Sequence, residues 1–412
     1  MFWKKEWPIL VGLEIGTSKI ACSVAELKKE GELYLLGIAE APSLHVRKGE
    51  IVDFELAQKS IQDALLEAES KTNVEIKEVY LAVSGAHIRS FNSKVVIGLG
   101  EEGDRIDQKH LNELRDLVRY QTLPTGQVLL HDLLKTYYLD DGTATENPVG
   151  LFSKKLAAEY HLISGIATRL QTTIRCVKEL SIDIRHYCLS IFATALAVLT
   201  RDQKKRGAIV IDLGAGLSDY IVYHRGLIVH SGVIGVGQDH LTNDLALALR
   251  IPFPQAEEIK RHFGSYRSDK EYLKKRIALS GQSLSEEKLV PYSTIVKILR
   301  ARQGEIFEII KEDLESQSFW PHFTGDIYLA GGGCMIEGIV ELAQEIFGHP
   351  VKIAEPLHFE GDQSYLRRPD LYTVLGLLRY ARVFELENIK AGPLDKMRTS
   401  LMKILGNIKF LN

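Results

Sequence analysis

Two short stretches of the sequence combine a carboxylate with a glycine turn in a way that suits phosphate chemistry. GLEIGTSKIACSVAE (12–26) and VIDLGAGLSDYIVY (210–223) each contain an apolar run, an acid, a turn of small residues and a second β-rich run. The acids are Glu14 and Asp212. A glycine turn between strands can expose backbone N–H groups to a phosphate, and a carboxylate at its edge can hold a hydrated metal ion. The two stretches therefore predict two phosphate-binding hairpins.

A third glycine cluster lies in IYLAGGGCMIEGIVELAQEIF (327–347), which predicts a strand, a turn at Gly331, Gly332 and Gly333, and an amphipathic helix. Glycines at such a turn let a flat ring approach the backbone. No G-x-G-x-x-G fingerprint follows any of the three strands, which argues against a dinucleotide cofactor.

The segments around the hairpins indicate how the motifs are positioned. Residues 56–70 are apolar at helical spacing, and residues 78–85 read as a strand. After the second hairpin, the pattern of helices and strands resumes. We expect two βββαβ-like lobes that face each other and direct both hairpins into one cleft.

Size and composition favour a multi-domain soluble protein. The chain has 412 residues, 45% of them apolar, and a net charge of −3, so neither disorder nor attraction to nucleic acid is indicated. Its four scattered cysteines fit reduced thiols in the cytoplasm. The N-terminus lacks the features of a signal peptide, and residues 190–199 are about half the length of a membrane span, so they predict a buried helix.

The order of these motifs resembles the phosphate-1, phosphate-2 and adenosine motifs of the actin-like ATPase superfamily. Within it, a series of segments is similar, in order, to the FtsA family of bacterial cell-division proteins. These segments are 79–93, 147–165, 235–264, 330–348 and 372–381. The resemblance covers nearly the whole chain, and residues 84–93 and 239–244 are specific to that family.

The resemblance implies an α/β actin-like ATPase fold: two lobes with ribonuclease-H-like cores, an FtsA-type 1C subdomain and a C-terminal amphipathic helix. It also implies a division into subdomains. Subdomain 1A consists of residues 1–85, 163–200 and 376–391, and subdomain 1C of residues 86–162. Subdomain 2A consists of residues 201–240 and 325–375, subdomain 2B of residues 241–324, and the linker and membrane helix of residues 392–412.

The resemblance also implies that the cleft binds ATP with Mg²⁺, the metal being held through water by Glu14 and Asp212. The residues expected around the nucleotide are Glu14, Gly16, Thr17, Ser18, Lys19, Asp212, Gly214, Ala215, Gly216, Leu217, Ser218, Glu257, Lys260, Gly331, Gly332, Gly333, Cys334 and Met335. Glu257 and Lys260 belong to a run that resembles the ribose- and base-contacting helix of the family. The alternative for this pair is an i, i+3 surface salt bridge.

Three departures from the family pattern predict that the protein binds a nucleotide but hydrolyses it slowly. Glu14 stands in place of aspartate, Ala215 in place of glycine and Leu217 in place of threonine. One missing hydrogen bond to a charged phosphate would cost roughly 1.5 to 3 kcal/mol, unless the neighbouring backbone supplies the contact. The helix at 190–199 lacks the glutamate that related sequences carry, so Asp212 is the one candidate base.

The implied partners are a second copy of the chain, the C-terminal tail of FtsZ, other division proteins through 1C, and an anionic membrane, with no nucleic acid. Arg302 matches a family arginine linked to the FtsZ tail, and Lys297 and Arg300 lie nearby on the helix predicted at 294–314. The expected location is peripheral, on the inner face of the cytoplasmic membrane at the division septum.

The last segment, 395–412, has the pattern of an interfacial helix. Its apolar face consists of Met397, Leu401, Ile404, Leu405, Ile408 and Leu411. Its cations are Lys396, Arg398, Lys403 and Lys409. The alternative is a helix packed on the core of the protein. At the level of function, the alternatives are a pilus-assembly platform protein of the PilM type and a small-molecule kinase of the same superfamily, although we find no catalytic residue for a kinase.

Overall fold

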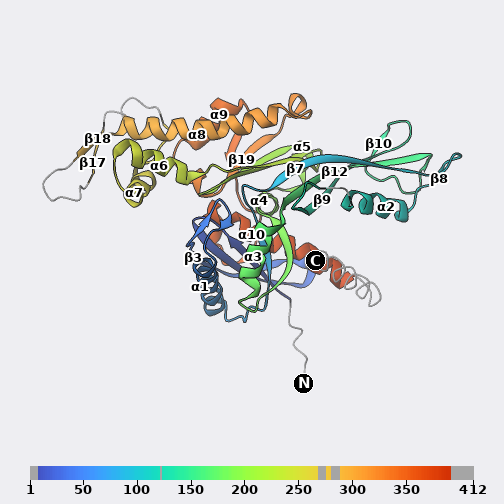
Figure 1. Ribbon diagram of the computed structural model, residues 1–412, viewed down its shortest axis with the longest axis horizontal. Coiled ribbons are helices and arrows are strands. Elements are labelled where there is room, and N and C mark those ends of the chain that lie inside the picture. The colour runs from blue at the N-terminus through green and yellow to red at the C-terminus, as the bar shows by residue number, and fades with distance from the viewer. Residues whose placement is uncertain (1–7, 121–122, 268–274, 280–287, 391–412) are drawn as a thin grey trace, which may run out of the picture.

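The computed structural model describes residues 8–120, 123–267, 275–279 and 288–390, and two mixed sheets form its centre (Figure 1). The first sheet has the strand order β13 (Asp183–Leu189), β6 (Glu78–Val83), β1 (Ile9–Ile15), β2 (Lys19–Leu27), β3 (Leu33–Pro42) and β21 (Glu360–Gly361). The second has the order β20 (Val351–Ile353), β19 (Asp326–Ala330), β14 (Ala208–Leu213), β15 (Ser218–His224) and β16 (Leu227–Ile234).

The two sheets repeat one topology. In the first, β1 pairs antiparallel with β2 and parallel with β6. In the second, β14 pairs antiparallel with β15 and parallel with β19. The repeat detected between 12–26 and 210–223 is therefore a repeat of the central hairpin of each ribonuclease-H-like sheet.

Helix α1 (Phe54–Thr72) confirms the helix predicted at 56–70 and covers the first sheet. Its buried positions, among them Ala57, Ile61 and Ala64, recur at helical spacing and pack with the strands. The side chain of Asp53 caps its first turn, and α3 (Ala167–Lys178) lies beside it. Before α1, β4 (Val46–Arg47) and β5 (Glu50–Ile51) form a small hairpin.

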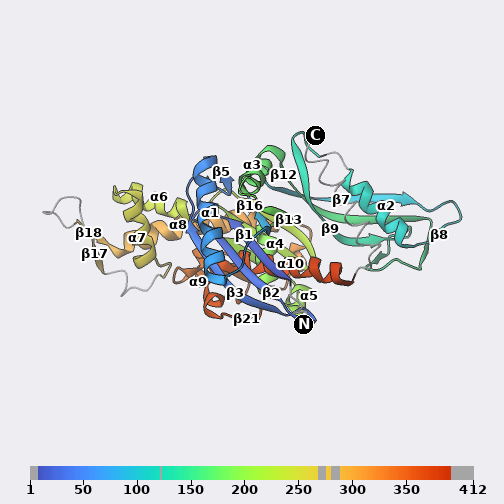
Figure 2. The same ribbon diagram turned by 90° about the horizontal axis from the view of Figure 1, so that it is seen from below.

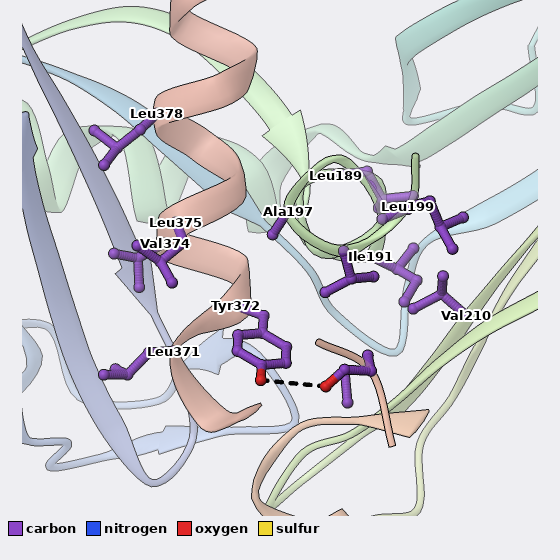
Figure 3. Close-up of a cluster of buried hydrophobic side chains, with 14 of the residues drawn as sticks. Leu189, Ile191, Ala197, Leu199, Val210, Leu371, Tyr372, Val374, Leu375 and Leu378 are labelled. Atoms are coloured by element: carbon purple, nitrogen blue, oxygen red, sulfur yellow. Dashed lines mark hydrogen bonds between the residues drawn. The ribbon is translucent and has the colours of Figure 1, made fainter. Parts of the chain in front are cut away.

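Helices α4 (Ser190–Val198) and α10 (Tyr372–Lys390) pack against each other between the two sheets (Figure 3). Gly376 permits this close approach, because a Cβ there would overlap the carbonyl of Ala193. The buried helix predicted at 190–199 is thus confirmed, and it helps to join the two lobes. The short helix α5 (Arg201–Arg206) follows α4.

Each lobe carries an insertion, and the two insertions extend to opposite ends of the molecule (Figures 1 and 2). The first insertion contains β7 (Arg89–Gly98), β8 (Asp104–Arg105), α2 (Gln108–Arg119), β9 (Gln127–Tyr138), β10 (Ala144–Thr145), β11 (Phe152–Ser153) and β12 (Lys155–Ile166). Its main sheet has the order β10-β9-β12-β7. The second contains α6 (Gln238–Leu249), α7 (Phe253–Phe263), β17 (Arg276–Leu279), β18 (Lys288–Pro291) and α8 (Tyr292–Glu315).

The third glycine cluster also adopts the predicted structure. β19 is followed by the 3-10 helix η4 (Gly332–Met335) and by α9 (Ile339–Phe347). All four cysteines are buried free thiols, as expected. In the part of the chain that the structure describes, no helix combines the length and apolarity needed to cross a membrane. The segment 395–412 lies outside the described residues.

Candidate functional site

The acids of the two hairpins meet at the base of a common site. Glu14 lies near the end of β1, and one of its carboxylate oxygens, Oε2, is buried and has no hydrogen-bond partner among the described residues. Burial and, to a smaller extent, the charge of Asp212 raise the pKa of Glu14 to about 8. A buried carboxylate oxygen without a donor fits a site that receives a cation.

Asp212 occupies the equivalent place on β14. The hydroxyl of Thr194, on α4, donates to its Oδ2 at 2.9 Å and lies 3.0 Å from the hydroxyl of Thr373, on α10. Burial raises the pKa of Asp212 to about 6, although hydrogen bonds from both threonines oppose the shift. The helices that join the lobes therefore orient this carboxylate.

Asp219, which follows the second turn, is a third buried carboxylate. Ser84 donates a hydrogen bond to its Oδ2 at 3.1 Å, and its Oδ1 has no partner in the described ranges. Burial and the charge of Asp212 raise the pKa of Asp219 to about 8. The raised pKa values of the three acids indicate that their neighbours do not fully stabilise the ionised forms, which a bound cation would stabilise.

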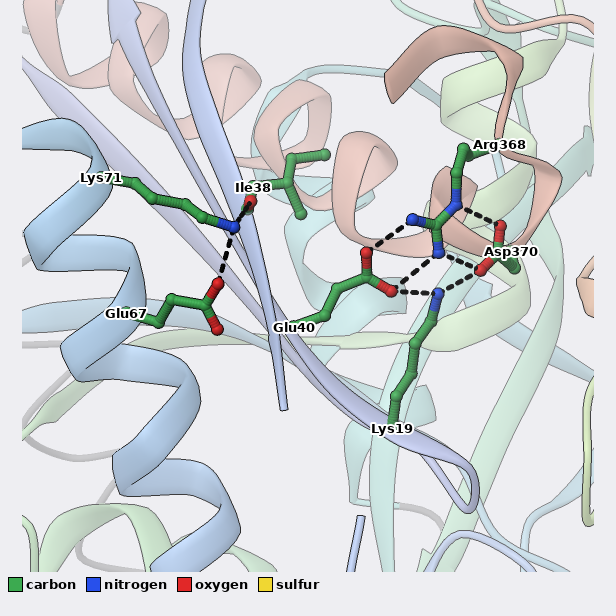
Figure 4. Close-up of polar contacts among 7 residues, drawn as sticks. All are labelled: Lys19, Ile38, Glu40, Glu67, Lys71, Arg368 and Asp370. Atoms are coloured by element: carbon green, nitrogen blue, oxygen red, sulfur yellow. Dashed lines mark hydrogen bonds and ion pairs between the residues drawn. The ribbon is translucent and has the colours of Figure 1, made fainter. Parts of the chain in front are cut away.

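Lys19 closes the first hairpin and is held by two acids (Figure 4). Its Nζ lies 2.8 Å from Glu40 Oε2 and also pairs with Asp370 Oδ2. Arg368 bridges the same two acids, at 2.7 and 2.8 Å from the Glu40 oxygens and 2.6 Å from Asp370 Oδ2. Burial alone would raise the pKa of Asp370, but Arg368 and Lys19 outweigh it and lower the pKa to about 2. This tetrad carries no net charge and fixes Lys19 at the turn.

The two turns contact each other. A Cβ on Gly216 would lie 2.6 Å from Thr17 Oγ1 and 2.9 Å from Lys48 N, so only glycine fits there. Within the described residues, no hydrogen bond uses the backbone N–H groups of Thr17, Ser18, Ala215 or Gly216 as donors. These groups are the donors that a phosphate at a glycine turn would use.

Two residues of the second turn have structural contacts. Leu217 is only 7% exposed, and its Cδ1 lies close to Gly49 in the β4–β5 hairpin. The hydroxyl of Ser218 donates to the carbonyl of Val236 at 2.9 Å. The side chain of Leu217 therefore fills the contact between the lobes, which explains an apolar residue at this position.

The glycines after β19 lie against the second hairpin. Gly331 has φ +81°, and a Cβ there would overlap Asp212 and Leu213. Cys334 is buried, and burial raises the pKa of its thiol to about 12, whereas Met335 is 63% exposed. Of this cluster, Met335 thus has the side chain most accessible to a ligand.

Glu257 and Lys260 form the i, i+3 salt bridge given as the alternative, with Lys260 buried and Glu257 partly exposed. Lys260 Nζ lies 2.7 Å from Glu257 Oε2, 2.7 Å from Thr242 Oγ1 and 3.0 Å from the carbonyl of Gln238. Lys260 is only 6% exposed, and burial lowers its pKa. The pair fastens α7 to α6, whose first backbone N–H donates to the carbonyl of Gly214 in the second turn.

The three cations expected to bind a partner do not form one ridge on α8. Arg302 holds Asp244 of α6 through two hydrogen bonds, of 2.6 and 3.2 Å, and borders a groove of about 570 Å³. Arg300 instead bonds the carbonyl of Tyr266 and Glu345, while Lys297 is exposed. The groove is lined by Asp244, Leu247, Ala248, Ile298, Ala301, Arg302 and Glu305.

Several residues of the site escaped the sequence analysis. Glu40, Ser84, Thr194, Arg368, Asp370 and Thr373 all contact the predicted residues. They come from four segments far apart in the sequence, the last of which supplies Arg368, Asp370 and Thr373. For Ser84, its position could have indicated a role in the site. It directly follows β6, the strand that pairs with β1 in the sheet.

Two ribonuclease-H-like sheets, joined by α4 and α10 and bearing paired hairpin turns around buried carboxylates, define an actin-like protein. Solved structures support this fold. The PilM-PilN type IV pilus biogenesis complex matches 90% of this chain and 98% of its own, with a TM-score of 0.63 and 17% identity. MreB5 of Spiroplasma citri bound to ADP matches 94% of this chain and 100% of its own, with a TM-score of 0.56 and 18% identity.

Sequence comparison identifies the family. The family model described as cell division protein FtsA matches residues 209–376, and the SHS2 domain inserted in FtsA matches 85–164. FtsA of Pseudomonas aeruginosa is 30% identical to this chain, and the match covers 90% of this chain and 89% of the relative. FtsA of Neisseria meningitidis is 31% identical, and the match covers 90% of this chain and 89% of the relative. The chain belongs to the FtsA family of actin-like cell-division proteins.

Proposed function

We propose that this chain is an ATP- and Mg²⁺-binding adaptor that self-associates and links FtsZ filaments to the inner face of the cytoplasmic membrane at the division septum. Any ATPase activity is secondary to binding. The observation that carries the nucleotide part is the convergence of Glu14 and Asp212 beside two turns with unused backbone N–H donors. The likeness to MreB5, whose structure was solved with ADP, supports the same reading.

The residues present fit a magnesium nucleotide. Glu14 and Asp212 supply oxygens that hydrated Mg²⁺ prefers, and Thr17, Ser18, Ala215 and Gly216 supply N–H donors for phosphate. Among the described residues, no group of three or more histidines, cysteines or acids is arranged to hold a metal ion. We therefore assign the remaining Mg²⁺ ligands to the nucleotide and to water, with Glu257, Lys260, Gly331 and Met335 on the adenosine side.

The adaptor role depends on surfaces outside the cleft. We assign the FtsZ tail to the groove between α6 and α8, where Arg302 lies beside apolar side chains such as Leu247, which is 69% exposed. Residues 395–412 serve as the amphipathic membrane helix. We retain the division into 1A, 1C, 2A and 2B at the boundaries expected from the sequence, with 1C available to other division proteins.

Mass spectrometry of the nucleotide that copurifies with the protein, followed by ATP titrations with and without Mg²⁺, tests the nucleotide site. We expect Mg²⁺ to strengthen ATP binding, and Asp212→Asn to reduce this Mg²⁺-dependent gain by tenfold or more. Asp202→Asn, on the exposed face of α5, is the matched control. ATP binding that neither Mg²⁺ nor Asp212→Asn alters would refute the proposed site.

A further inference from the structure

The β4–β5 hairpin of the first lobe reaches both turns of the proposed nucleotide site. The backbone N–H of Gly49 donates to the hydroxyl of Thr17, in the first turn, at 3.3 Å. A Cβ on Gly49 would lie 3.1 Å from Cδ1 of Leu217, in the second turn. A Cβ on Gly216 of the same turn would lie 2.9 Å from the backbone N of Lys48. The tip of the hairpin, which consists of Lys48 and Gly49, therefore lies where the two turns meet.

The side chain of Lys48 continues along the second lobe. Its Nζ lies 3.7 Å, and its Cδ 3.8 Å, from the place that a Cβ on Gly235 would occupy. The segment that begins at Gly235 packs on the second turn, since a Cβ on Gly237 would lie 2.6 Å from two carbonyl oxygens of that turn. Lys48 thus extends from a hairpin of the first lobe over the phosphate turn of the second.

The ammonium group of Lys48 is available to a ligand. The residue is exposed, and within the described ranges no ion pair or hydrogen bond engages its Nζ. Lys19, by contrast, is already held by Glu40 and Asp370. Lys48 therefore offers the cleft a cation beside the unused N–H groups of the second turn.

The backbone of the hairpin tip favours a role for this side chain beyond the turn itself. Lys48 has φ +50° and Gly49 has φ +70°, and a type I′ turn requires a positive φ at both of its central residues. The first of these positions favours asparagine, aspartate or glycine, because a positive φ is unfavourable for most residues with a side chain. Since such strain gathers at binding sites, a lysine here indicates that its charge is used.

An ammonium group in this position can bind a phosphate oxygen. The residues that we assign to the adenosine side all belong to the second lobe, so the phosphate that reaches the meeting point of both turns is the one farthest from adenosine. We propose that Lys48 binds the terminal phosphate of a nucleoside triphosphate and thereby links the first lobe to the second. This inference rests on the proposed nucleotide function.

Calorimetric titration of the full-length protein with ADP and with AMPPNP, an ATP analogue that resists hydrolysis, tests this assignment in the presence of Mg²⁺. We expect Lys48→Asn to weaken AMPPNP binding at least tenfold and ADP binding less than twofold, because only AMPPNP carries the terminal phosphate. Asparagine suits a positive φ, so the melting temperature of the nucleotide-free variant should be unchanged or higher.

Arg47→Gln is the matched control, because it removes a positive charge one residue away. Arg47 lies opposite Glu50 in the hairpin, and Glu50 pairs with Arg169 of α3. We expect this variant to change neither affinity by more than twofold.

The outcomes separate this inference from the proposed function. If Lys48→Asn and the wild type bind AMPPNP equally, Lys48 does not contact the terminal phosphate, although the nucleotide site stands. An equal loss for both nucleotides, or the same loss in Arg47→Gln, would reveal a general effect on the cleft or its charge and would also refute the inference. If the wild type binds neither nucleotide, the proposed function fails and this inference fails with it.

Discussion

Glu14, Asp212 and Asp219 place three carboxylates in one buried site, and the described residues offset their charge only in part. Lys19, the cation of the first hairpin, already pairs with Glu40 and Asp370. The neutral hydroxyls of Thr194 and Ser84 stabilise one oxygen each on Asp212 and Asp219. The proposed function assigns the missing charge to a Mg²⁺ ion held through water by Glu14 and Asp212 together with the nucleotide.

The same contacts predict slow hydrolysis. Asp370 and Glu40 are engaged by Lys19 and Arg368, so neither is free to accept a proton from water. Glu14 and Asp212 are the proposed ligands of hydrated Mg²⁺, and Ser84 and Thr194 occupy one oxygen each of Asp219 and Asp212. We expect phosphate release in an enzyme-coupled assay far below the enzyme median of about 10 per second. Turnover near that median would show that a further group activates water.

Leu217→Thr tests the packing role of the second turn. Threonine would remove apolar contact with the β4–β5 hairpin and bury a hydroxyl, so the free energy of unfolding should fall by about 1 to 3 kcal/mol. Urea denaturation measures this change. Leu247→Thr, at an exposed position, should change it by less than about 0.5 kcal/mol. Equal stability of Leu217→Thr and the wild type would contradict the packing role.

The sequence predicted the residues that lie within the hairpins but missed those that orient them. Glu14, Lys19 and Asp212 could be found because each sits at a fixed offset from a glycine turn. Thr194, Thr373 and Asp370 reach the site through helix packing and a distant loop, and no spacing in the chain encodes such contacts. The packing role of Leu217 was missed for the same reason, since its neighbour Gly49 is far away in the sequence.

Among the elements, those with clear periodicity were predicted and those that pair across the lobes were not. α1 and α8 were predicted because apolar residues recur at helical spacing along them, and α4 because its apolar run is too short to span a membrane. The contact between the first insertion and the second sheet could not be anticipated. There, His161 of β12 lies 2.8 Å from the hydroxyl of Ser231 on β16 and 2.9 Å from Asn92 on β7.

This contact predicts a pH-dependent stability. His161 is fully buried, and burial, followed by the charge of His230, lowers its pKa to about 3, against about 6.5 when unfolded. Between these values the unfolded chain binds the proton and the folded chain does not. The stabilisation is therefore fully present above pH 6.5 and is lost as the pH falls toward 3.

His161→Gln isolates this effect from other titrating groups. The difference in free energy of unfolding between wild type and variant should shrink below about pH 6, by up to about 1.4 kcal/mol per pH unit. Urea denaturation from pH 5 to pH 7.5 measures it. A difference that stays constant across this range would show that His161 is accessible to protons in the folded protein.

The proposed docking of the FtsZ tail in the groove between α6 and α8 can be tested at Arg302. Arg302→Glu should weaken binding of an FtsZ C-terminal peptide at least tenfold, because the new charge would face Asp244 and Glu305 and repel an acidic peptide. Peptide titration at low salt measures the effect, since screening is weakest there. Lys297→Glu, on the same helix but outside the residues that line the groove, is the matched control. Equal losses in both variants would indicate a general charge effect and not a docking site.

At the scale of the whole molecule, α4 and α10 connect two similar sheets and also supply Thr194 and Thr373 to the carboxylate site. A movement of one lobe against the other would therefore alter the surroundings of Asp212. The duplicated hairpins predicted two lobes from the sequence. The placement of the two insertions at opposite ends of the molecule was not predicted, because it depends on where the chain leaves each sheet (Figure 1).

The segment after α10 provides the last prediction. Residues 395–412 combine an apolar face at helical spacing with four cations, a pattern suited to an anionic membrane surface. Each cation near such a surface contributes about 1 kcal/mol. The described part of the chain, which runs to Lys390 in α10, contains both lobes and the proposed nucleotide site, so deletion of 395–412 removes none of their residues.

We therefore expect the truncated protein to keep its cooperative melting transition and its ATP affinity, and to lose sedimentation with phosphatidylglycerol vesicles. A full-length variant in which Leu401 and Ile404 are replaced by aspartate should show the same loss, because it removes the apolar face without shortening the chain. Full-length protein with phosphatidylcholine vesicles controls for binding that does not depend on lipid charge. If the truncated protein still sedimented with anionic vesicles, the membrane contact would lie in the folded lobes. If it lost its cooperative transition, residues 395–412 would instead pack on the core.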